Sequence, residues 1–252
     1  MTGTTTGAAI AYCGSPPSPA DLMGAWNLDP VLIAALLIYV PVALRYSANR
    51  NAAFGAWALA WLFFVSPLCA LTSALFSARV LHHVVLIAAI APLLAVAFPN
   101  VLRRGLPAGA VFLAHLVALW VWHAPGPYAW ALSTVWGYWF MQATLLLTAW
   151  ALWHEVLRPQ AAAMPLALLL GTVGHMGLLG ALLVFTPTPL YVAHFATTEA
   201  WGLQPLVDQQ LAGLMMWVPA MLPYLAVGTL IALRHFPSEA EEPGMPSEEF
   251  RQ

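Results

Sequence analysis

Apolar segments of nearly constant length dominate this sequence. A helix that crosses the hydrocarbon of a bilayer needs about 17 to 25 mostly apolar residues. Seven segments come near that length, at 29–44, 52–75, 80–98, 107–123, 135–157, 162–185 and 207–233. Lipid cannot satisfy backbone polar groups, so each segment has to bond internally as a helix. We therefore predict an all-α, polytopic membrane protein whose transmembrane domain is a seven-helix bundle.

Composition excludes several classes of function. Of 252 residues, 62% are hydrophobic and 7% are charged, which is outside the range of soluble domains. The net charge of −2 provides no basic surface for nucleic acid. All eight basic residues are Arg, and the absence of Lys excludes a Schiff-base chromophore such as retinal. The sequence contains no phosphate-binding glycine loop, nucleophile elbow or His-Glu-x-x-His motif, and we expect no enzyme.

The arginines predict an orientation, because positive residues stay on the cytoplasmic side of a membrane. In a seven-span arrangement, only Arg79 falls on the opposite side from the rest, which are Arg45, Arg50, Arg103, Arg104, Arg158, Arg234 and Arg251. The amino terminus is therefore predicted outside and the carboxyl terminus in the cytoplasm.

Three regions follow from this arrangement. Residues 1–28 are predicted to form a polar periplasmic tail that holds Cys13, and they lack the basic start of a conventional signal peptide. Residues 29–233 form the transmembrane domain, and the acidic residues 234–252 are expected to be disordered. Four glycines at intervals of three in the sixth segment predict close helix packing or room for a ligand; these are Gly171, Gly174, Gly177 and Gly180.

Polar residues gather at the predicted outer face. Histidines lie there at the ends of two segments and in one loop (His82, His83, His123 and His194), together with Cys13, Cys69 and Asp208. The two cysteines allow either one disulfide or a thiolate metal ligand. Met215 shares a helix face with Asp208, about 10 Å further along the axis. Imidazole, thiolate and thioether groups together suit copper, and Cu(I) especially.

Each histidine also has a plainer interpretation, as an interfacial group or one that bonds a neighbouring helix. His82 and His83 point about 100° apart on a regular helix, so we do not expect both to bind one ion. Of the two, we favour His83. The grouping of these residues at one face, rather than any single member, is what indicates a metal site.

Four fragments resemble a known family. Residues 208–219 read DQQLAGLMMWVP, and residues 77–86 carry His83 ahead of Pro92. Trp122-His123-Ala124-Pro125 is followed by Tyr128, and Pro189-Leu190-Tyr191 follows the sixth segment. Together, in this order, they resemble the caa3-type CtaG family of membrane cytochrome c oxidase assembly factors. Arg79 stands where the family has the first of two histidines, and an Arg cannot ligate a metal.

The resemblance implies a seven-span protein of the bacterial inner membrane that assists assembly of a haem-copper oxidase. Joined to the polar cluster, it predicts transient Cu(I) binding at the periplasmic face and delivery to oxidase subunits, with a periplasmic copper donor as a further partner. The expected ligands are Cys13, His83, His123 and Asp208, with secondary candidates His82, His194, Met215 and Cys69.

Two alternatives remain open from the residues alone. One is a metal-free scaffold that docks an oxidase subunit through its glycine and aromatic faces. The other is a haem-binding redox protein that uses His115 and His175, both near the middle of their segments. His154, Glu155 and Arg158 are expected to form a solvated cytoplasmic cluster.

Overall fold

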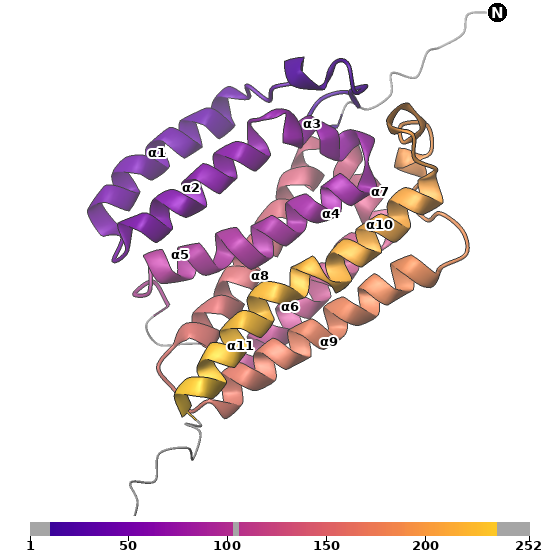
Figure 1. The fold of residues 1–252 in the computed structure, drawn as a ribbon. Coiled ribbons are helices and arrows are strands. Elements are labelled where there is room, and N and C mark those ends of the chain that lie inside the picture. Colours follow the sequence, from indigo (N-terminus) through magenta and orange to yellow (C-terminus); the bar gives the residue numbers. More distant parts are fainter. Residues whose placement is uncertain (1–10, 103–105, 236–252) are drawn as a thin grey trace, which may run out of the picture.

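The computed structural model describes residues 11–102 and 106–235, and within these ranges it contains helices and no strand. Figure 1 shows the helices gathered in one bundle. In chain order they are α1 (Pro30–Tyr46), α2 (Arg50–Phe64), α3 (Pro67–Ala74), α4 (Phe76–Val85), α5 (Ala91–Ala97), α6 (Ala108–His123), α7 (Pro125–Ser133), α8 (Val135–Leu157), α9 (Ala163–Phe185), α10 (Pro205–Trp217) and α11 (Leu222–His235). Short turns are η1 (Leu22–Gly24), η2 (Leu86–Ile90), η3 (Val192–His194), η4 (Glu199–Trp201) and η5 (Pro219–Met221).

The all-α prediction is confirmed, and each predicted apolar segment is helical over most of its length. In the described part of the chain, three helical runs are long and apolar enough to cross a membrane: Phe76–Ala97, Ala163–Phe185 and Pro205–His235. The bent pairs α2–α3 and α6–α7 raise that number to five if each pair is one span. The count of seven spans and the orientation of the termini remain predictions.

Prolines explain both bends. The pair α2–α3 turns by 52° just before Pro67, and α6–α7 turns by 76° just before Pro125. A proline ring disfavours the helical conformation of the residue before it, so the preceding helix ends there and a new one starts at the proline. The helix α7 is not among the predicted segments, because it lies in the connection between two of them.

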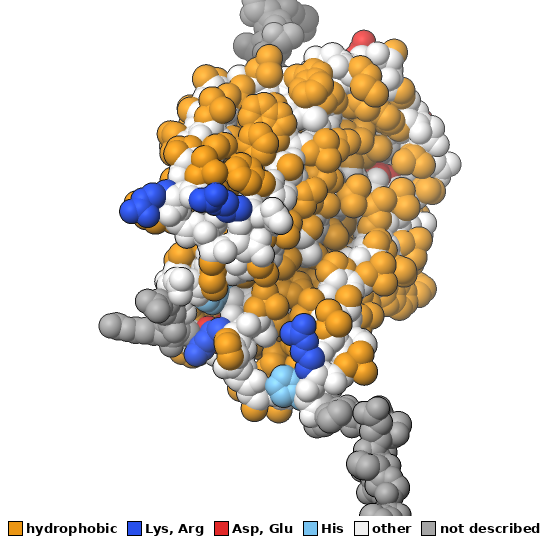
Figure 2. Space-filling view, turned by 60° about the vertical axis from the view of Figure 1, so that its left-hand side comes forward, with side chains coloured by type: hydrophobic (Ala, Val, Ile, Leu, Met, Phe, Trp, Pro, Cys, Tyr) orange, Lys and Arg blue, Asp and Glu red, His pale blue; other side chains and the backbone are white. Residues whose placement is uncertain are grey.

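The outside of the bundle is apolar. Figure 2 shows one face covered mostly by hydrophobic side chains, with few charged groups among them. Val31, Trp136 and Phe185 are each more than 70% exposed. Apolar exposure on this scale is rare in soluble monomers and suits a helix surface that faces lipid.

A π-helical turn, η2, joins α4 to α5 into one continuous run. In a π-turn the carbonyl of Ile87 would accept from the backbone five residues on, where Pro92 has no N–H. Instead, Trp153 Nε1 on α8 donates to the Ile87 oxygen at 2.8 Å. A buried carbonyl that helix geometry leaves without a donor thereby ties this run to α8.

Helices α9 and α10 lie side by side (Figure 1) and approach closely at two glycines. A Cβ on Gly180 would lie 2.8 Å from the Gly213 carbonyl oxygen, and one on Gly213 would lie 2.6 Å from that of Gly180. The predicted packing use of the glycine series therefore holds at Gly180. A Cβ on Gly174 would meet no heavy atom within 4 Å, so that position does not share this role.

Residues 11–28 fold back onto the end of the bundle that carries α3. Cys13 forms a disulfide with Cys69 of α3, and Trp201 Nε1 donates to the Pro17 carbonyl at 3.1 Å. Cys13 is buried, so this part of the predicted polar tail packs against the bundle. Of the predicted acidic tail, residues 236–252 lie outside the described residues, as do Arg103 and Arg104.

Candidate functional site

The carboxylate of Asp208, on the first turns of α10, binds the first turn of α4. One oxygen accepts the Phe76 N–H at 2.7 Å; the other accepts the Ser77 N–H at 3.2 Å and the Ser77 hydroxyl. The residue before α4, Leu75, has no side chain that can cap the helix. Asp208 supplies that cap from another helix, with its charge at the positive end of the α4 dipole. This role explains the carboxylate without a metal ion.

The two amides that follow Asp208 hold the end of α9. Gln209 donates to the Leu183 carbonyl at 3.2 Å and accepts the Leu190 N–H at 2.7 Å, and Gln210 donates to the Val184 carbonyl at 3.3 Å. The acid and both amides therefore fix α10 against α4 and α9. They set the frame in which the neighbouring histidines lie.

His83 of α4 and His123 of α6 lie next to each other, with ring centroids 6.1 Å apart. The Nδ1 of His123 lies 2.7 Å from the Leu119 carbonyl oxygen. A carbonyl only accepts, so Nδ1 carries the proton, and the lone pair of His123 is on Nε2. Neither ring nitrogen of His83 has a hydrogen-bonding partner among the described residues. Two imidazoles from different helices are thus brought together with lone pairs to offer.

The secondary candidates divide between this pair and other contacts. His82 lies against the Phe64 ring, with centroids 4.5 Å apart, and its nitrogens have no partner in the described part of the chain. His194 Nε2 lies 2.7 Å from the Tyr128 hydroxyl. Met215 is half-buried and packs against the apolar cluster that contains Phe76. Of the two histidines, only His82 has both ring nitrogens free of hydrogen bonds in the described part of the chain.

Burial lowers the pKa of His194 to about 4, and the nearby charge of Arg79 acts in the same direction. This loop histidine is therefore neutral at physiological pH. In its neutral form it can either accept from or donate to the Tyr128 hydroxyl. The bond links the loop before α10 to α7, so it belongs to the frame around the histidine pair.

The two cysteines are joined to each other in the structure. In this oxidised form neither sulfur is a thiolate, and Cu(I) binding by Cys13 or Cys69 would first require reduction. Of the two alternatives left by the sequence, the disulfide is the one that the structure contains.

Arg79 is the residue whose surroundings the sequence misjudged most. Its side chain is fully buried inside the bundle, one turn before His82 and His83 on α4. Its guanidinium carbon lies 5.3 Å from the centre of the Tyr138 ring. An Arg at the outer surface would be an exception to the rule that positive residues stay on the cytoplasmic side. A buried Arg gives no information on orientation, because the rule applies to loops outside the membrane. The one sequence feature that indicated an unusual environment for Arg79 was its place where the family has a histidine.

Within the described ranges, no group of three or more His, Cys, Asp or Glu side chains is arranged to hold a metal ion. A second pair, His115 of α6 and His175 of α9, has ring centroids 6.4 Å apart. His115 Nδ1 lies 3.0 Å from the Thr148 hydroxyl, and the Phe112 ring lies beside His175. His115 Nε2 and both ring nitrogens of His175 have no hydrogen-bonding partner among the described residues, so the packing role and the haem role both remain predictions.

The predicted solvated cluster at the other end is wrong in one respect. His154 and Glu155 are buried, at 5% and 2% exposure. Glu155 accepts the Leu106 N–H at 2.9 Å and pairs with Arg158 at 2.8 Å. These two partners replace the solvent that the buried carboxylate would otherwise need. The bond to Leu106 also fixes the connection before α6.

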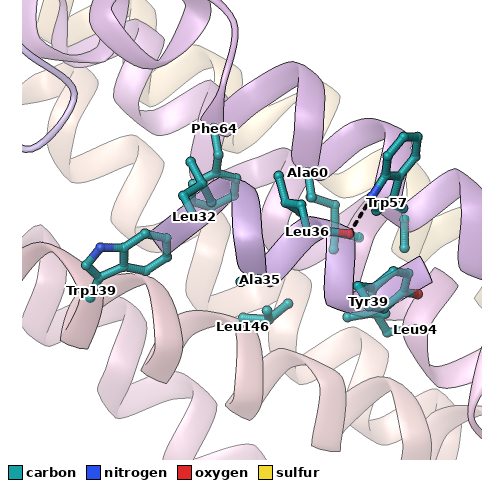
Figure 3. Close-up of a pocket in the computed structure, with 12 residues that line it drawn as sticks. Leu32, Ala35, Leu36, Tyr39, Trp57, Ala60, Phe64, Leu94, Trp139 and Leu146 are labelled. Atoms are coloured by element: carbon teal, nitrogen blue, oxygen red, sulfur yellow. Dashed lines mark hydrogen bonds between the residues drawn. The ribbon is translucent and has the colours of Figure 1, made fainter. Parts of the chain in front are cut away.

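An apolar groove lies elsewhere, between α1 and α2 on one side and α5 and α8 on the other. Figure 3 shows its lining side chains, among them Leu36, Tyr39, Trp57, Leu94 and Trp139. Its volume is about 250 Å³, and Trp57 Nε1 donates to the Leu36 carbonyl at 2.9 Å. It contains no histidine or carboxylate, so it is separate from the histidine cluster.

With the Asp-Gln-Gln run, the Trp-His-x-Pro turn and the His83 helix placed at one end of the bundle, the family can be assigned. The family model described as cytochrome c oxidase caa3 assembly factor (Caa3_CtaG) matches residues 36–237. The chain belongs to this family. No curated protein and no solved structure matches the chain significantly. The matched region of this Caa3_CtaG member includes both histidine pairs, Arg79 and Asp208, and leaves Cys13 outside.

Proposed function

We propose that this member of the cytochrome c oxidase assembly factor family takes up Cu(I) as transient cargo between His83 and His123 and passes it to an oxidase subunit. The observation that carries the proposal is the meeting of these two rings, 6.1 Å apart, with His83 unpartnered and the His123 lone pair on Nε2. Two imidazoles that share one ion through nitrogens at about 2 Å would have ring centres on the order of 6 Å apart.

The chemistry of the pair fits a cargo ion. Imidazole nitrogen is a good ligand for copper. Two ligands without a third leave the ion open to exchange, whereas a closed four-ligand cage would retain it. Asp208 is already engaged at the start of α4, so this proposal no longer includes it among the ligands.

The disulfide supports the compartment assumed here. Disulfides persist in the bacterial periplasm and are rare in the cytosol. Tyr12, next to Cys13, stacks on Tyr138, and the Tyr138 ring also contacts Arg79, one turn before His83. The disulfide therefore lies at the end of the bundle that holds the histidine pair. A bacterial inner-membrane protein with this end in the periplasm would meet its oxidase partner there, and its role would not be catalytic.

The test is Cu(I) competition with a coloured Cu(I) chelator, using the detergent-purified protein without thiol reductant so that the disulfide stays intact. Wild type should bind about one Cu(I), and His83→Ala and His123→Ala should each weaken binding at least tenfold, an order-of-magnitude expectation for loss of a ligand. His115→Ala is the matched control, because it removes another buried histidine from α6, the helix that carries His123.

Failure of wild type to bind Cu(I), or an equal loss in His115→Ala, would overturn the copper proposal. The scaffold alternative predicts a different result in cells. There, co-purification of oxidase subunits would survive His83→Ala together with His123→Ala, and oxidase copper content would stay at the wild-type level.

A further inference from the structure

Arg79 is a fully buried cation without a counter-charge among the described residues. Its side chain is 0% exposed, and none of its three guanidinium nitrogens has a hydrogen-bonding partner among the residues that the structure describes. A guanidinium is charged at any physiological pH and can only donate. Burying such a charge without a partner costs far more than burying a paired one.

The carboxylate that caps the same helix, Asp208, is already occupied. Both oxygens of Asp208 bind the first turn of α4. The one ion pair within residues 11–102 and 106–235 is Arg158 with Glu155, which are not part of this cluster. The Tyr138 ring offers its face to Arg79, but a cation–π contact leaves the N–H groups at the edge of the guanidinium unpaired.

The surroundings of Arg79 contain several uncommitted neutral polar groups, but no carboxylate is paired with it in the described ranges. His82 and His83 lie three and four residues further along α4, on the same face, and each neutral ring has one N–H. Gln142, one turn along α8 from Tyr138, is 2% exposed, and neither its oxygen nor its nitrogen has a partner in the described ranges. Tyr128 and His194 also lie within reach of the Arg79 charge, and they bind each other.

We propose that Arg79 is the centre of a binding site for a small monovalent anion, either a halide or the carboxylate group of a small molecule. The guanidinium supplies the charge and the N–H groups of one edge, while His82, His83 and Gln142 offer further donors around it. An anion there would neutralise the buried charge and accept the N–H groups that face it. This inference does not depend on copper binding, and it is specific to a chain that has Arg at this position.

The site can be tested on the full-length protein in detergent, with gluconate as a bulky, strongly hydrated reference anion. Titration with chloride or with formate should raise the unfolding temperature by several degrees and reach saturation. Arg79→Met has a similar length and no charge, and it should abolish the response. In gluconate it should be at least as stable as wild type, because the unpaired charge has gone. Arg45→Met, at an exposed arginine, should keep the wild-type response.

A second measurement on wild type alone covers the case in which Arg79→Met does not fold. The ³⁵Cl resonance of the buffer should broaden in the presence of the protein and sharpen again as formate displaces chloride. If formate saturates at a concentration at least tenfold lower than chloride, the natural occupant is a carboxylate; the reverse order indicates a halide. The proposal is overturned if no salt raises stability above gluconate, if the response never saturates, or if Arg79→Met responds as wild type does.

Discussion

Asp208 accepts the Phe76 N–H at 2.7 Å, so a carboxylate on α10 caps a helix that begins more than 130 residues earlier in the chain. The bond sets the start of α4 and thereby the direction of the face that carries Arg79, His82 and His83. A residue that resembles a metal ligand in sequence is, in the folded chain, the anchor that orders the residues around it.

Asp208→Ala should therefore lower stability more than it changes chemistry at the histidine pair. Removing the carboxylate leaves two buried backbone N–H groups and one hydroxyl without acceptors, and we expect a loss of about 2 kcal/mol. Thermal unfolding in detergent measures it, with the exposed Asp21→Ala as the control. A change of less than a few tenths of a kcal/mol would contradict the capping role.

The contact between α9 and α10 predicts opposite outcomes for two glycines of one series. Gly180→Ala places a methyl group against the Gly213 carbonyl, and backbone cannot move aside as a side chain can. We expect a loss of about 1 to 3 kcal/mol. Gly174→Ala meets open space and should be neutral or slightly stabilising, because Ala is the better helix former. The unfolding temperatures of the two variants provide the comparison, and equal effects would contradict it.

Opening the disulfide should loosen the segment before α1. Cys13 and Cys69 are 56 positions apart, and a link across a loop of this size contributes about 2 to 4 kcal/mol. Thermal unfolding of Cys13→Ser with Cys69→Ser, compared with wild type with and without reductant, measures the difference. Reductant should lower the unfolding temperature of wild type only. Limited proteolysis should then cut ahead of Pro30, and an uncut segment would show that its other contacts suffice.

Stability should fall in mild acid through His194. Its pKa is lowered to about 4 in the folded protein, so between pH 6.5 and 4 the unfolded chain takes up a proton that the folded chain does not. The contribution of neutral His194 is complete above pH 6.5 and is lost as the pH falls through this window. Each pKa unit corresponds to about 1.4 kcal/mol.

His194→Gln should flatten the pH dependence of stability between pH 6.5 and 4, because Gln retains a bonding group for Tyr128 and does not titrate. Denaturation curves at several pH values check this. His235→Gln, at an exposed histidine, should leave the wild-type slope unchanged. A His194→Gln curve parallel to that of wild type would show that other groups cause the acid sensitivity.

Arg79 should also affect the affinity of the histidine pair for a cation. A buried positive charge four residues from His83 repels an ion bound there, so Arg79→His should tighten Cu(I) binding at least tenfold, both by removing the charge and by adding an imidazole. The chelator competition that tests His83 and His123 measures this too. Unchanged or weaker binding would mean that the charge of Arg79 does not reach the metal position.

The sequence by itself determined the class of the fold and the family. Seven apolar segments could only be helices in lipid, and short motifs in a fixed order identified the assembly factor family. These inferences rest on local properties, namely the length of an apolar run and the identity of neighbouring residues, which do not depend on how the helices pack.

Tertiary structure alone decided what the polar residues do. Asp208 became a helix cap because its carboxylate reached free N–H groups on another helix, and Cys13 found Cys69 across the fold. The meeting of His83 with His123 and the burial of Arg79 depend on helix order and rotation. Spacing along one chain cannot specify those, because they follow from which helix faces bury each other best.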